Sequence, residues 1–271
     1  MIRQIIVGTR VGRIAQSIKA LIGLCLAARR HGESMGTHCN DVIAEKLITN
    51  MCPNGGCFVD IGAHIGSISS EVLRTAPNAT IYAVEAMPDK AENLQKKFKK
   101  IHVLNYAVGN DQGIIPFYVN KSRSGYSSII QPSSESKDIW KEIQVKTKRL
   151  DQIILDTAID VIKIDVEGAE YDVIRGSKNI IRNFRPLIMF ESGPYLSSLE
   201  KNIRIGIFNF FKDNNYIVLI PNRLAHNDDG LTIDCFLDSH IYPRRTTNYF
   251  AIPVEKKHMW KEKARAVLRF K

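Results

Sequence analysis

The segment Cys57–Gly66, with the sequence CFVDIGAHIG, limits the possible folds of this chain more than any other stretch. An apolar run that contains Asp60 leads into a turn with glycines at positions 62 and 66. The apolar residues suit a buried parallel strand, and Gly62 permits a sharp turn and a close backbone approach to a ligand. A helix is expected from Ser67 onwards, so that its unpaired backbone N–H groups face the same turn. The segment therefore predicts the strand, turn and helix of a nucleotide-binding α/β unit.

A second predicted strand, Ala79–Val84, ends directly before an acidic residue, Glu85. Glu85 follows Asp60 by about 25 residues. In α/β sheets that bind nucleotides, an acid near this position accepts hydrogen bonds from ribose hydroxyls. The spacing therefore predicts that Glu85 binds the ribose of an adenosine cofactor.

Two classes of cofactor share this layout. Dinucleotide sites use three glycines, in the pattern Gly-x-Gly-x-x-Gly, because the pyrophosphate lies on the helix N-terminus. This turn has only Gly62 and Gly66, and Asp60 would repel a pyrophosphate. A carboxylate there suits the positive sulfonium and amino groups of S-adenosylmethionine. The turn therefore favours that cofactor, although the same glycine spacing also occurs in α/β turns that hold no ligand.

A third predicted strand, Val161–Ile164, is followed by a turn rich in acids. Asp165, Glu167 and Glu170 lie within six residues, and Gly168 is expected to turn the chain into a helix from about Ala169 to Ser177. Like charges this close disfavour the folded state unless something uses them. The turn is therefore predicted to be functional rather than a solvated loop.

A fourth predicted strand, Leu187–Glu191, also ends in an acid, and Ser192-Gly-Pro194 follows it. In an open α/β sheet, ligands bind beyond the carboxyl ends of the strands. The acids at these strand ends are therefore expected to meet in one crevice; they are Asp60, Glu85, Asp165 and Glu191.

A series of short motifs runs from about Gly56 to Pro253. In order they are DIGAHIG, YAVEAMPD, NYAVGNDQG with SGYSSI, IKIDVEGAEYDVIRGSK, MFESG and NYFAIP. This series resembles the FkbM family of methyltransferases. IKIDVEGAE is its most specific part, whereas the glycine turn is common to many methyltransferases. The resemblance implies an S-adenosylmethionine-dependent class I enzyme, usually one that methylates a hydroxyl oxygen of a sugar, glycolipid or polyketide.

The resemblance also assigns roles to individual residues. Carried over by position, Asp60, Gly62 and Gly66 line the methionine end of the cofactor, Glu85 holds the ribose, and Ala107 and Val108 flank the adenine after a strand at His102–Tyr106. His64 departs from the family turn, which more often has Asn at this position. Two roles stay open for His64: a surface substitution, or a titrating group beside the sulfonium.

The predicted fold class is α/β. Strands alternate with helices from Gly56 to Glu191, which argues for a parallel sheet with crossover helices. The resemblance adds a Rossmann-like class I arrangement with an antiparallel last strand and helices on both faces. An extra strand at Ile114–Val119 and a polar loop at Ser122–Ser128 interrupt the pattern; this loop either covers the crevice or is a surface excursion.

The chain is predicted to have three parts. Residues 1–55 form a helical lead, residues 56–253 form the methyltransferase domain, and residues 254–271 form a basic amphipathic tail. In the lead, a second helix is expected at about Asp41–Met51. Its first helix is predicted from apolar residues that recur at helical spacing, namely Val11, Ile14, Ile18, Leu21, Ile22 and Cys25.

The net charge of +10 is concentrated at the two ends of the chain. Residues 1–35 carry +5 and residues 241–271 carry +7, whereas the segment between them carries −2. In the tail, Trp260, Ala264, Val267 and Leu268 fall on one helical face. Such a helix either lies on an anionic membrane surface or packs its apolar side on the domain. Nucleic-acid binding is a third interpretation of the same charge.

Cysteine usage and hydropathy favour a cytoplasmic protein. Five cysteines form an odd number without a framework spacing, and no second pair completes a zinc site with Cys52 and Cys57. Reduced thiols in the cytosol are expected. The longest apolar run, Ala20–Ala28, is about half of what a membrane span needs. Because Arg29 and Arg30 follow it directly, a secretory signal is not expected, and peripheral membrane contact through the basic termini stays open.

The predicted reaction is in-line transfer of a methyl group from the sulfonium to a substrate oxygen. Asp165 and Glu191 are the leading candidates for the base, with His64 and His226 as weaker ones. A divalent cation held by Asp165, Glu167 or Glu191 is the alternative means of activating the oxygen, although no ligand spacing demands it.

Two other functions are weighed against this one. Amino-directed nucleic-acid methyltransferases usually carry an Asn/Asp-Pro-Pro-aromatic turn after the fourth strand, where this chain has Asp165-Val-Glu-Gly168, so that function is disfavoured. The other is a non-catalytic binding module of the same fold. The joint presence of Gly62, Glu85, Asp165 and Glu191 argues against such decay.

Overall fold

The computed structural model describes residues 6–122, 125, 127–130, 138–155 and 157–269. Its centre is a seven-stranded sheet with the order β3-β2-β1-β7-β8-β10-β9. The first five strands in this order are parallel, and β10 runs antiparallel to both β8 and β9. The strands are β1 Cys57–Ile61, β2 Thr80–Val84, β3 His102–Leu104, β7 Val161–Ile164, β8 Leu187–Glu191, β9 Tyr216–Leu219 and β10 Asn248–Pro253. This arrangement confirms the predicted class I sheet with its antiparallel last strand.

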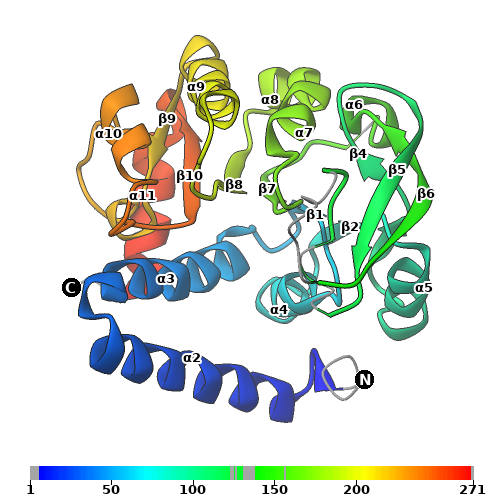
Figure 1. Ribbon diagram of the computed structural model, residues 1–271, viewed down its shortest axis with the longest axis horizontal. Helices are drawn as coiled ribbons and strands as arrows, with labels where there is room; N and C mark the ends of the chain where they lie inside the picture. Colours follow the sequence, from blue (N-terminus) through cyan, green and yellow to red (C-terminus); the bar gives the residue numbers. More distant parts are fainter. Residues whose placement is uncertain (1–5, 123–124, 126, 131–137, 156, 270–271) are drawn as a thin grey trace.

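Helices cover both faces of this sheet (Figure 1). Alternate residues of each central strand face opposite cores, as the period of two for strand side chains requires. Val59 and Ile61 of β1 pack toward helices α7, α8, α9 and α10, whereas Phe58, which precedes Val59, packs toward α3, α4 and α11. The α-helices are α2 Arg10–Arg30, α3 Met35–Met51, α4 Ser67–Thr75, α5 Pro88–Lys97, α6 Leu150–Ile153, α7 Glu170–Gly176, α8 Lys178–Phe184, α9 Ser198–Asp213, α10 Ile233–Asp238 and α11 Lys257–Leu268. Short 3₁₀ turns are η1 Gly32–Ser34, η3 Pro221–Arg223 and η4 Val254–Lys256.

A separate three-stranded sheet lies near the carboxyl ends of the parallel strands in the main sheet. Its order is β4-β6-β5, with β4 at Ala107–Val108, β5 at Gly113–Asn120 and β6 at Trp140–Lys148. The sequence predicted β5 but not β6, whose residues alternate between polar and apolar without turn signals that mark its ends. Part of the predicted loop Ser122–Ser128 lies outside the described residues.

The C-terminal helix α11 belongs to the core. Trp260 is 2% exposed and Ala264 is fully buried, and Val267 and Leu268 pack against the same cluster as α3. The apolar side of the tail is therefore inside the domain. Of the two arrangements left open by the sequence, packing on the domain is the one the structure has, and the apolar side of the tail is not available to a membrane.

Helix α2 lies outside this core, alongside α3 (Figure 1). By length and composition alone, its residues Arg10–Arg29 could cross a membrane. This corrects the expectation that no segment approaches that length, because the helix extends well beyond the uninterrupted apolar run Ala20–Ala28.

The turn after β1 requires glycine for a reason internal to the fold. Gly62 has a φ of +79°, and a Cβ atom on it would lie 1.8 Å from the carbonyl oxygen of Asp165. The backbone N–H groups of Gly62 and Ala63 both donate to the carbonyl oxygen of Val84, at 2.9 and 3.1 Å. Gly62 thus lets the ends of β1, β2 and β7 approach one another closely.

We predict that Gly62→Ala destabilises the protein by more than about 3 kcal/mol, because a left-handed conformation and a backbone clash are combined. Gly55→Ala is the matched control: its φ is +87°, but a Cβ atom there would meet nothing within 4 Å. The control should lose only about 1–2 kcal/mol, from the conformation alone. Urea unfolding measures both losses, and equal losses would contradict the close approach of Gly62 to β7.

Candidate active site

A buried lysine lies between two of the predicted acids. The Lys163 Nζ is 3.3 Å from Asp60 Oδ1 and 3.2 Å from Asp165 Oδ2, and it donates to the Gly62 carbonyl oxygen at 3.1 Å. Burial alone would lower the pKa of Lys163, but the charges of Asp165 and Asp60 outweigh it and raise that pKa. Lys163 was missed at the sequence level, although a lysine inside the otherwise apolar run Val161–Ile164 is a signal of a buried ion pair.

Asp60 and Gly66 stabilise the turn after β1, but they do not line the cavity beside it. Asp60 is fully buried, and its Oδ2 accepts a hydrogen bond from Ser69 Oγ of α4 at 2.6 Å. A Cβ atom on Gly66 would lie 2.7 Å from Leu94 Cδ2 and 2.9 Å from Phe98 Cε2, so this glycine serves the packing of α4 on α5. The geometry therefore argues against direct contact of Asp60 or Gly66 with a cofactor.

A cavity of about 310 Å³ opens at the carboxyl ends of β1, β2 and β7, next to the small sheet. Its apolar wall includes Met87 and Phe117. Six of the predicted site residues line it: Gly62, His64, Glu85, Ala107, Val108 and Asp165. The structure thus brings together most of the residues assigned to cofactor binding, while their contacts with a cofactor stay predictions.

Glu85 joins the two turns that border the cavity. Its Oε2 accepts from the His64 N–H at 2.7 Å, and its Oε1 accepts from the Met87 N–H at 2.9 Å. Burial raises the pKa of Glu85, an effect partly offset by nearby Lys90 and by these two hydrogen bonds. Each carboxylate oxygen has a second lone pair, so the ribose hydroxyls can still be bound.

His64 adopts a left-handed backbone conformation with a φ of +52°. Asn and His both occur at such positions more often than most residues, which explains how His replaces the family's Asn without disturbing the turn. His64 is half-buried and lines both the main cavity and a second one of about 270 Å³ beneath α2. Its side chain therefore borders the site and is not a mere surface substitution.

The loop that leads from β5 to β6 covers the acidic turn. Ser128 Oγ donates to the Glu167 carbonyl oxygen at 2.7 Å, and Ile130 lies against Gly168. Gly125, Ser127 and Ile129 line the cavity. In the residues that are described, this loop lies over the crevice, the first of the two arrangements that the sequence allowed.

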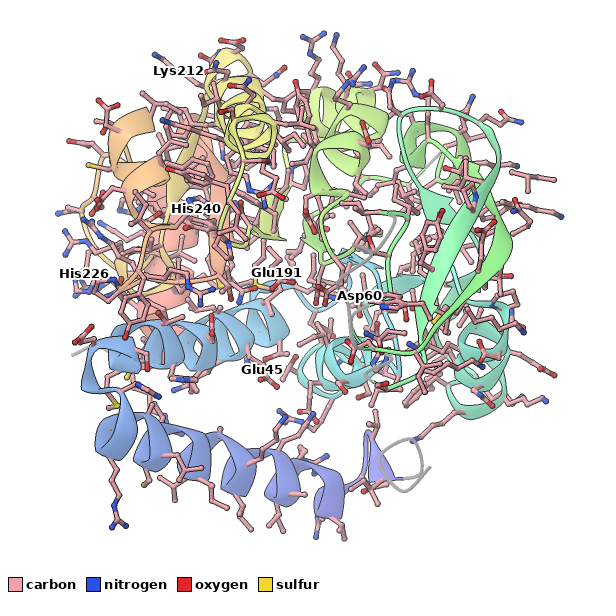
Figure 2. All side chains as sticks on the ribbon, viewed as in Figure 1. Glu45, Asp60, Glu191, Lys212, His226 and His240 are labelled. Carbon is pink, nitrogen blue, oxygen red and sulfur yellow. The ribbon has the colours of Figure 1, made fainter. Side chains whose placement is uncertain are left out.

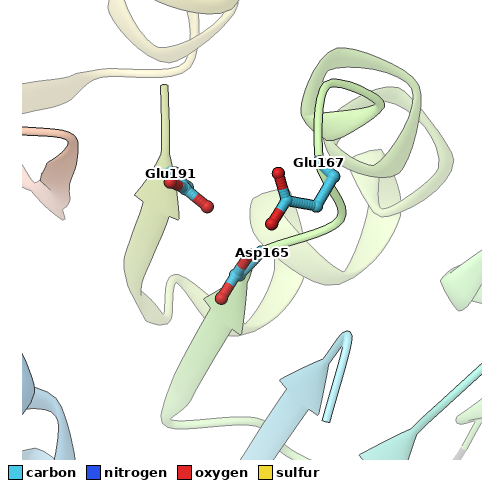
Figure 3. A group of neighbouring side chains, drawn as sticks. All are labelled: Asp165, Glu167 and Glu191. Atoms are coloured by element: carbon cyan, nitrogen blue, oxygen red, sulfur yellow. The ribbon is translucent and has the colours of Figure 1, made fainter. Parts of the chain in front are cut away.

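Three carboxyl groups face one another at the edge of the sheet (Figure 3). Asp165 directly follows β7, Glu167 lies in the same turn, and Glu191 ends β8; one oxygen of each lies within 4.8 Å of the others. All three are half-buried. The structure thus joins both predicted catalytic residues, Asp165 and Glu191, with Glu167.

The three groups have different affinities for protons. Burial would raise the pKa of Asp165, but Lys163 and a hydrogen bond with Glu191 lower it below its usual value. Burial, the Asp165 charge and the same hydrogen bond raise the pKa of Glu191. Glu191 is therefore protonated at neutral pH and donates to the Asp165 carboxylate. Burial and repulsion by Asp165 and Glu170 raise the pKa of Glu167 to about 7.

Two other residues considered from the sequence are not part of this cluster. The Glu170 side chain turns back into its own loop, where its Oε1 accepts from the Gly168 N–H at 2.9 Å. Its role is to hold the turn. His226 lies near the edge of the molecule, far from Asp60 (Figure 2), so it cannot act as the base.

A buried histidine, His240, holds the residue that follows Glu191. His240 Nε2 is 2.8 Å from Ser192 Oγ, and its Nδ1 is 2.7 Å from the Phe236 carbonyl oxygen. Burial lowers the pKa of His240 to about 4, so the ring is neutral at physiological pH. In that state Nδ1–H donates to Phe236 and Nε2 accepts from Ser192, which fixes the residue after Glu191. No sequence motif pointed to His240.

The sheet order and the cavity at the carboxyl ends of its strands are those of the class I methyltransferase fold. A family profile described as the methyltransferase FkbM domain matches residues 60–218, which is more than half of the chain. The chain belongs to this family.

The chain is also similar to individual proteins. The 2-O-methyltransferase NoeI of Sinorhizobium fredii is 28% identical over 145 residues, which are 47% of this chain and 60% of that protein. Methyltransferase 1 of Beauveria bassiana is 26% identical over 147 residues, which are 46% and 59% of the two chains. The match thus spans about three fifths of the length of these curated relatives. A solved FkbM methyltransferase of Methylobacillus flagellatus has 17% identity and a TM-score of 0.46, covering 74% of this chain and 44% of that one.

We predict that Lys163→Met lowers stability by about 3–5 kcal/mol, because two carboxylates lose their buried partner. The loss should grow as pH rises. In the wild type, Asp165 has a lowered pKa and contributes stability above its unfolded pKa. Without Lys163 the folded-state pKa of Asp165 rises, and the stability lost increases with pH until this carboxyl is ionised.

Urea unfolding at pH 5 and pH 8 tests this prediction. Lys146→Met, at an exposed position in β6, is the control and should change stability by less than about 0.5 kcal/mol. A difference between wild type and Lys163→Met that stayed the same at both pH values would contradict the proposed charge pairing.

Proposed function

We propose that this protein transfers a methyl group from S-adenosylmethionine to a hydroxyl oxygen of a sugar, glycolipid or related metabolite. The observation that carries the proposal is the group of three carboxyls at the cavity edge, because a hydroxyl acceptor must lose a proton and an acid cluster can take it. Two further points support it. The turn Asp165-Val-Glu-Gly168 lacks the proline-lined sequence used to stack bases. One relative is named as a 2-O-methyltransferase.

The residues of the cavity fit the cofactor. Glu85 offers acceptor lone pairs for the ribose, and the apolar wall of Ala107, Val108 and Phe117 suits a flat adenine ring. Asp165 and Glu167 add carboxyl groups to the lining of the same cavity. S-adenosylmethionine supplies an electrophilic methyl group on a positively charged sulfonium, which these carboxylates attract.

In this proposal the chain aligns the acceptor and removes its proton. Glu167 is the group best suited to accept the proton, because its pKa of about 7 lies near the working pH. Asp165 stays ionised beside Lys163 and can orient the acceptor hydroxyl. Glu191 holds its own proton and fixes the Asp165 carboxylate. Positioning of acceptor and cofactor in line supplies most of the acceleration.

A divalent cation is the second candidate for activating the acceptor. The three carboxyl groups offer oxygen ligands within 4.8 Å of one another, and hard oxygen ligands suit magnesium. In that case Asp165, Glu167 and Glu191 would hold the ion and would all be deprotonated. Addition and removal of the ion distinguishes the two candidates, as described below.

We predict that Glu85→Gln weakens S-adenosylmethionine binding by about 1.5–3 kcal/mol, the worth of hydrogen bonds to a charged group. Glu85→Ala should destabilise the fold more than Glu85→Gln, because Ala leaves both the His64 and the Met87 N–H groups without their acceptor, whereas Gln keeps one acceptor oxygen. Calorimetric titration measures the affinity, and Glu92→Gln on the exposed side of α5 is the control. Unchanged affinity in Glu85→Gln would remove this residue from the cofactor site.

We predict that kcat/KM rises with pH through about 7, because Glu167 must be deprotonated to act as the base. Glu167→Gln should remove this step and lower the rate by about 10²–10⁴-fold, with little change in cofactor binding. Asp165→Asn should also lower the rate strongly. A pH profile of Glu167→Gln that still rose near pH 7 would contradict the assignment.

The same assay, with sugars and glycolipids as acceptors and labelled methyl groups, decides between the base and the cation. If EDTA abolishes the activity of the wild type and magnesium restores it, the cation is the activating group. Methylation of RNA or DNA but of no hydroxylated metabolite would overturn the proposed acceptor class. Cofactor binding without transfer to any acceptor would instead favour a binding module.

A further inference from the structure

Helix α2 presents its apolar side to solvent. Val11 is 65% exposed, Ile14 is 61% exposed and Leu21 is 63% exposed. Ile18, Ile22 and Cys25 continue the same stripe and are exposed as well. These six residues, the outer stripe, recur at helical spacing and therefore share one side of the helix. An exposed apolar surface of this extent marks an interaction site.

The opposite side of α2 is held against the domain. Gly12 and Ala27 are buried there. The Arg13 Nη1 is 3.8 Å from Glu71 Oε1 of α4, and Thr9 Oγ1 caps the helix by accepting from the Gly12 N–H at 3.1 Å. Just before the helix, Val7 is buried. Since the inner side is thus fixed, the outer stripe cannot turn inward without breaking these contacts.

The charge of α2 indicates what covers the outer stripe. Besides Arg13, which faces Glu71, the helix carries Arg10, Lys19, Arg29 and Arg30 and no acidic residue. Residues 1–35 have a net charge of +5. An apolar stripe with basic residues around it fits a surface that is apolar inside and anionic at its boundary. We propose that α2 docks the protein on an anionic lipid bilayer, with the outer stripe in the boundary between headgroups and acyl chains.

The arrangement of α2 favours lying on the bilayer over crossing it. The helix runs along the domain beside α3 (Figure 1), so one side of it is already occupied by protein. Lys19, near its middle, is exposed, and its charge would be costly at the centre of a bilayer. With 21 residues, the helix offers a contact roughly 30 Å long. This docking is independent of the acceptor proposed above.

Vesicle sedimentation tests the proposal with the full chain. The wild type should sediment with phosphatidylserine-containing vesicles at low salt and stay in the supernatant with neutral vesicles. It should be released at 1 M salt, where the Debye length is about 3 Å. Ile14→Glu/Ile18→Glu should reduce the bound fraction at least about tenfold, because apolar area is lost and negative charge is added.

The matched control is Ile114→Glu/Leu155→Glu. Both residues are 68% exposed and lie in β5 and after α6, so this variant has the same change of charge and loses at least as much exposed apolar area. It should bind vesicles as the wild type does. Circular dichroism of both variants should match the wild type, since no buried side chain is altered. Equal vesicle binding by the α2 variant and the control, or no binding by the wild type, would overturn the proposal.

The chain's own cysteines allow a second, direct readout. Cys52 and Cys57 are buried, whereas Cys25, Cys39 and Cys235 are exposed. An environment-sensitive dye on Cys25, in a Cys39→Ser/Cys235→Ser protein, should brighten when anionic vesicles are added. The same dye on Cys235 of α10, in a Cys25→Ser/Cys39→Ser protein, should not. A change at Cys25 that followed protein concentration without vesicles would show that a second copy of the chain covers the stripe, and this would overturn the membrane proposal.

Discussion

The rest of the site depends on the contact of the Lys163 ammonium with Asp60, Asp165 and the Gly62 carbonyl oxygen. It links the end of β1 to the end of β7 at the point where the cavity opens. Two carboxylates and one lysine leave a negative charge there, which the surroundings have to accommodate. Because the cation is buried, it acts on these acids with little screening by solvent.

The proton distribution in the acid cluster follows from the position of this one cation. Lys163 touches Asp165 but neither Glu167 nor Glu191, so Asp165 ionises first and the other two groups become harder to ionise. A shared hydrogen bond then joins protonated Glu191 to Asp165. Three chemically similar carboxyls thereby acquire different tasks: a fixed anion, a hydrogen-bond donor and a group that titrates near neutral pH. Pairs of acids with separated pKa values are a common basis for acid and base roles.

The sequence predicted the strands well because each central strand is a short apolar run that ends in an acid or a glycine turn. It predicted the cavity residues Gly62, Glu85 and Asp165 for the same reason. It did not predict Lys163 as a site residue, because the partners of a buried charge come from distant strands. His240 was missed because its role depends on packing between α10 and the end of β8.

The spacing of apolar residues also does not decide whether the apolar side of a helix faces the core or the solvent. Helices α2 and α11 both carry an apolar stripe among basic residues, yet the stripe of α11 is buried and that of α2 is exposed. The difference comes from the space available on the sheet. Helices α3 and α11 already cover the face near Phe58, so α2 is left beside α3, which it meets through its opposite side. Only the assembled fold shows which of the two apolar stripes is buried.

The most direct measurement of the account is carboxyl ¹³C NMR of the glutamate-labelled protein across pH. The account predicts that one resonance, absent from Glu191→Gln, stays in its protonated position at pH 7. A second resonance, absent from Glu167→Gln, should titrate with a pKa of about 7. If both groups instead ionised near pH 4.5, the value of an ordinary glutamate, Lys163 would not organise the cluster and the central claim would be wrong.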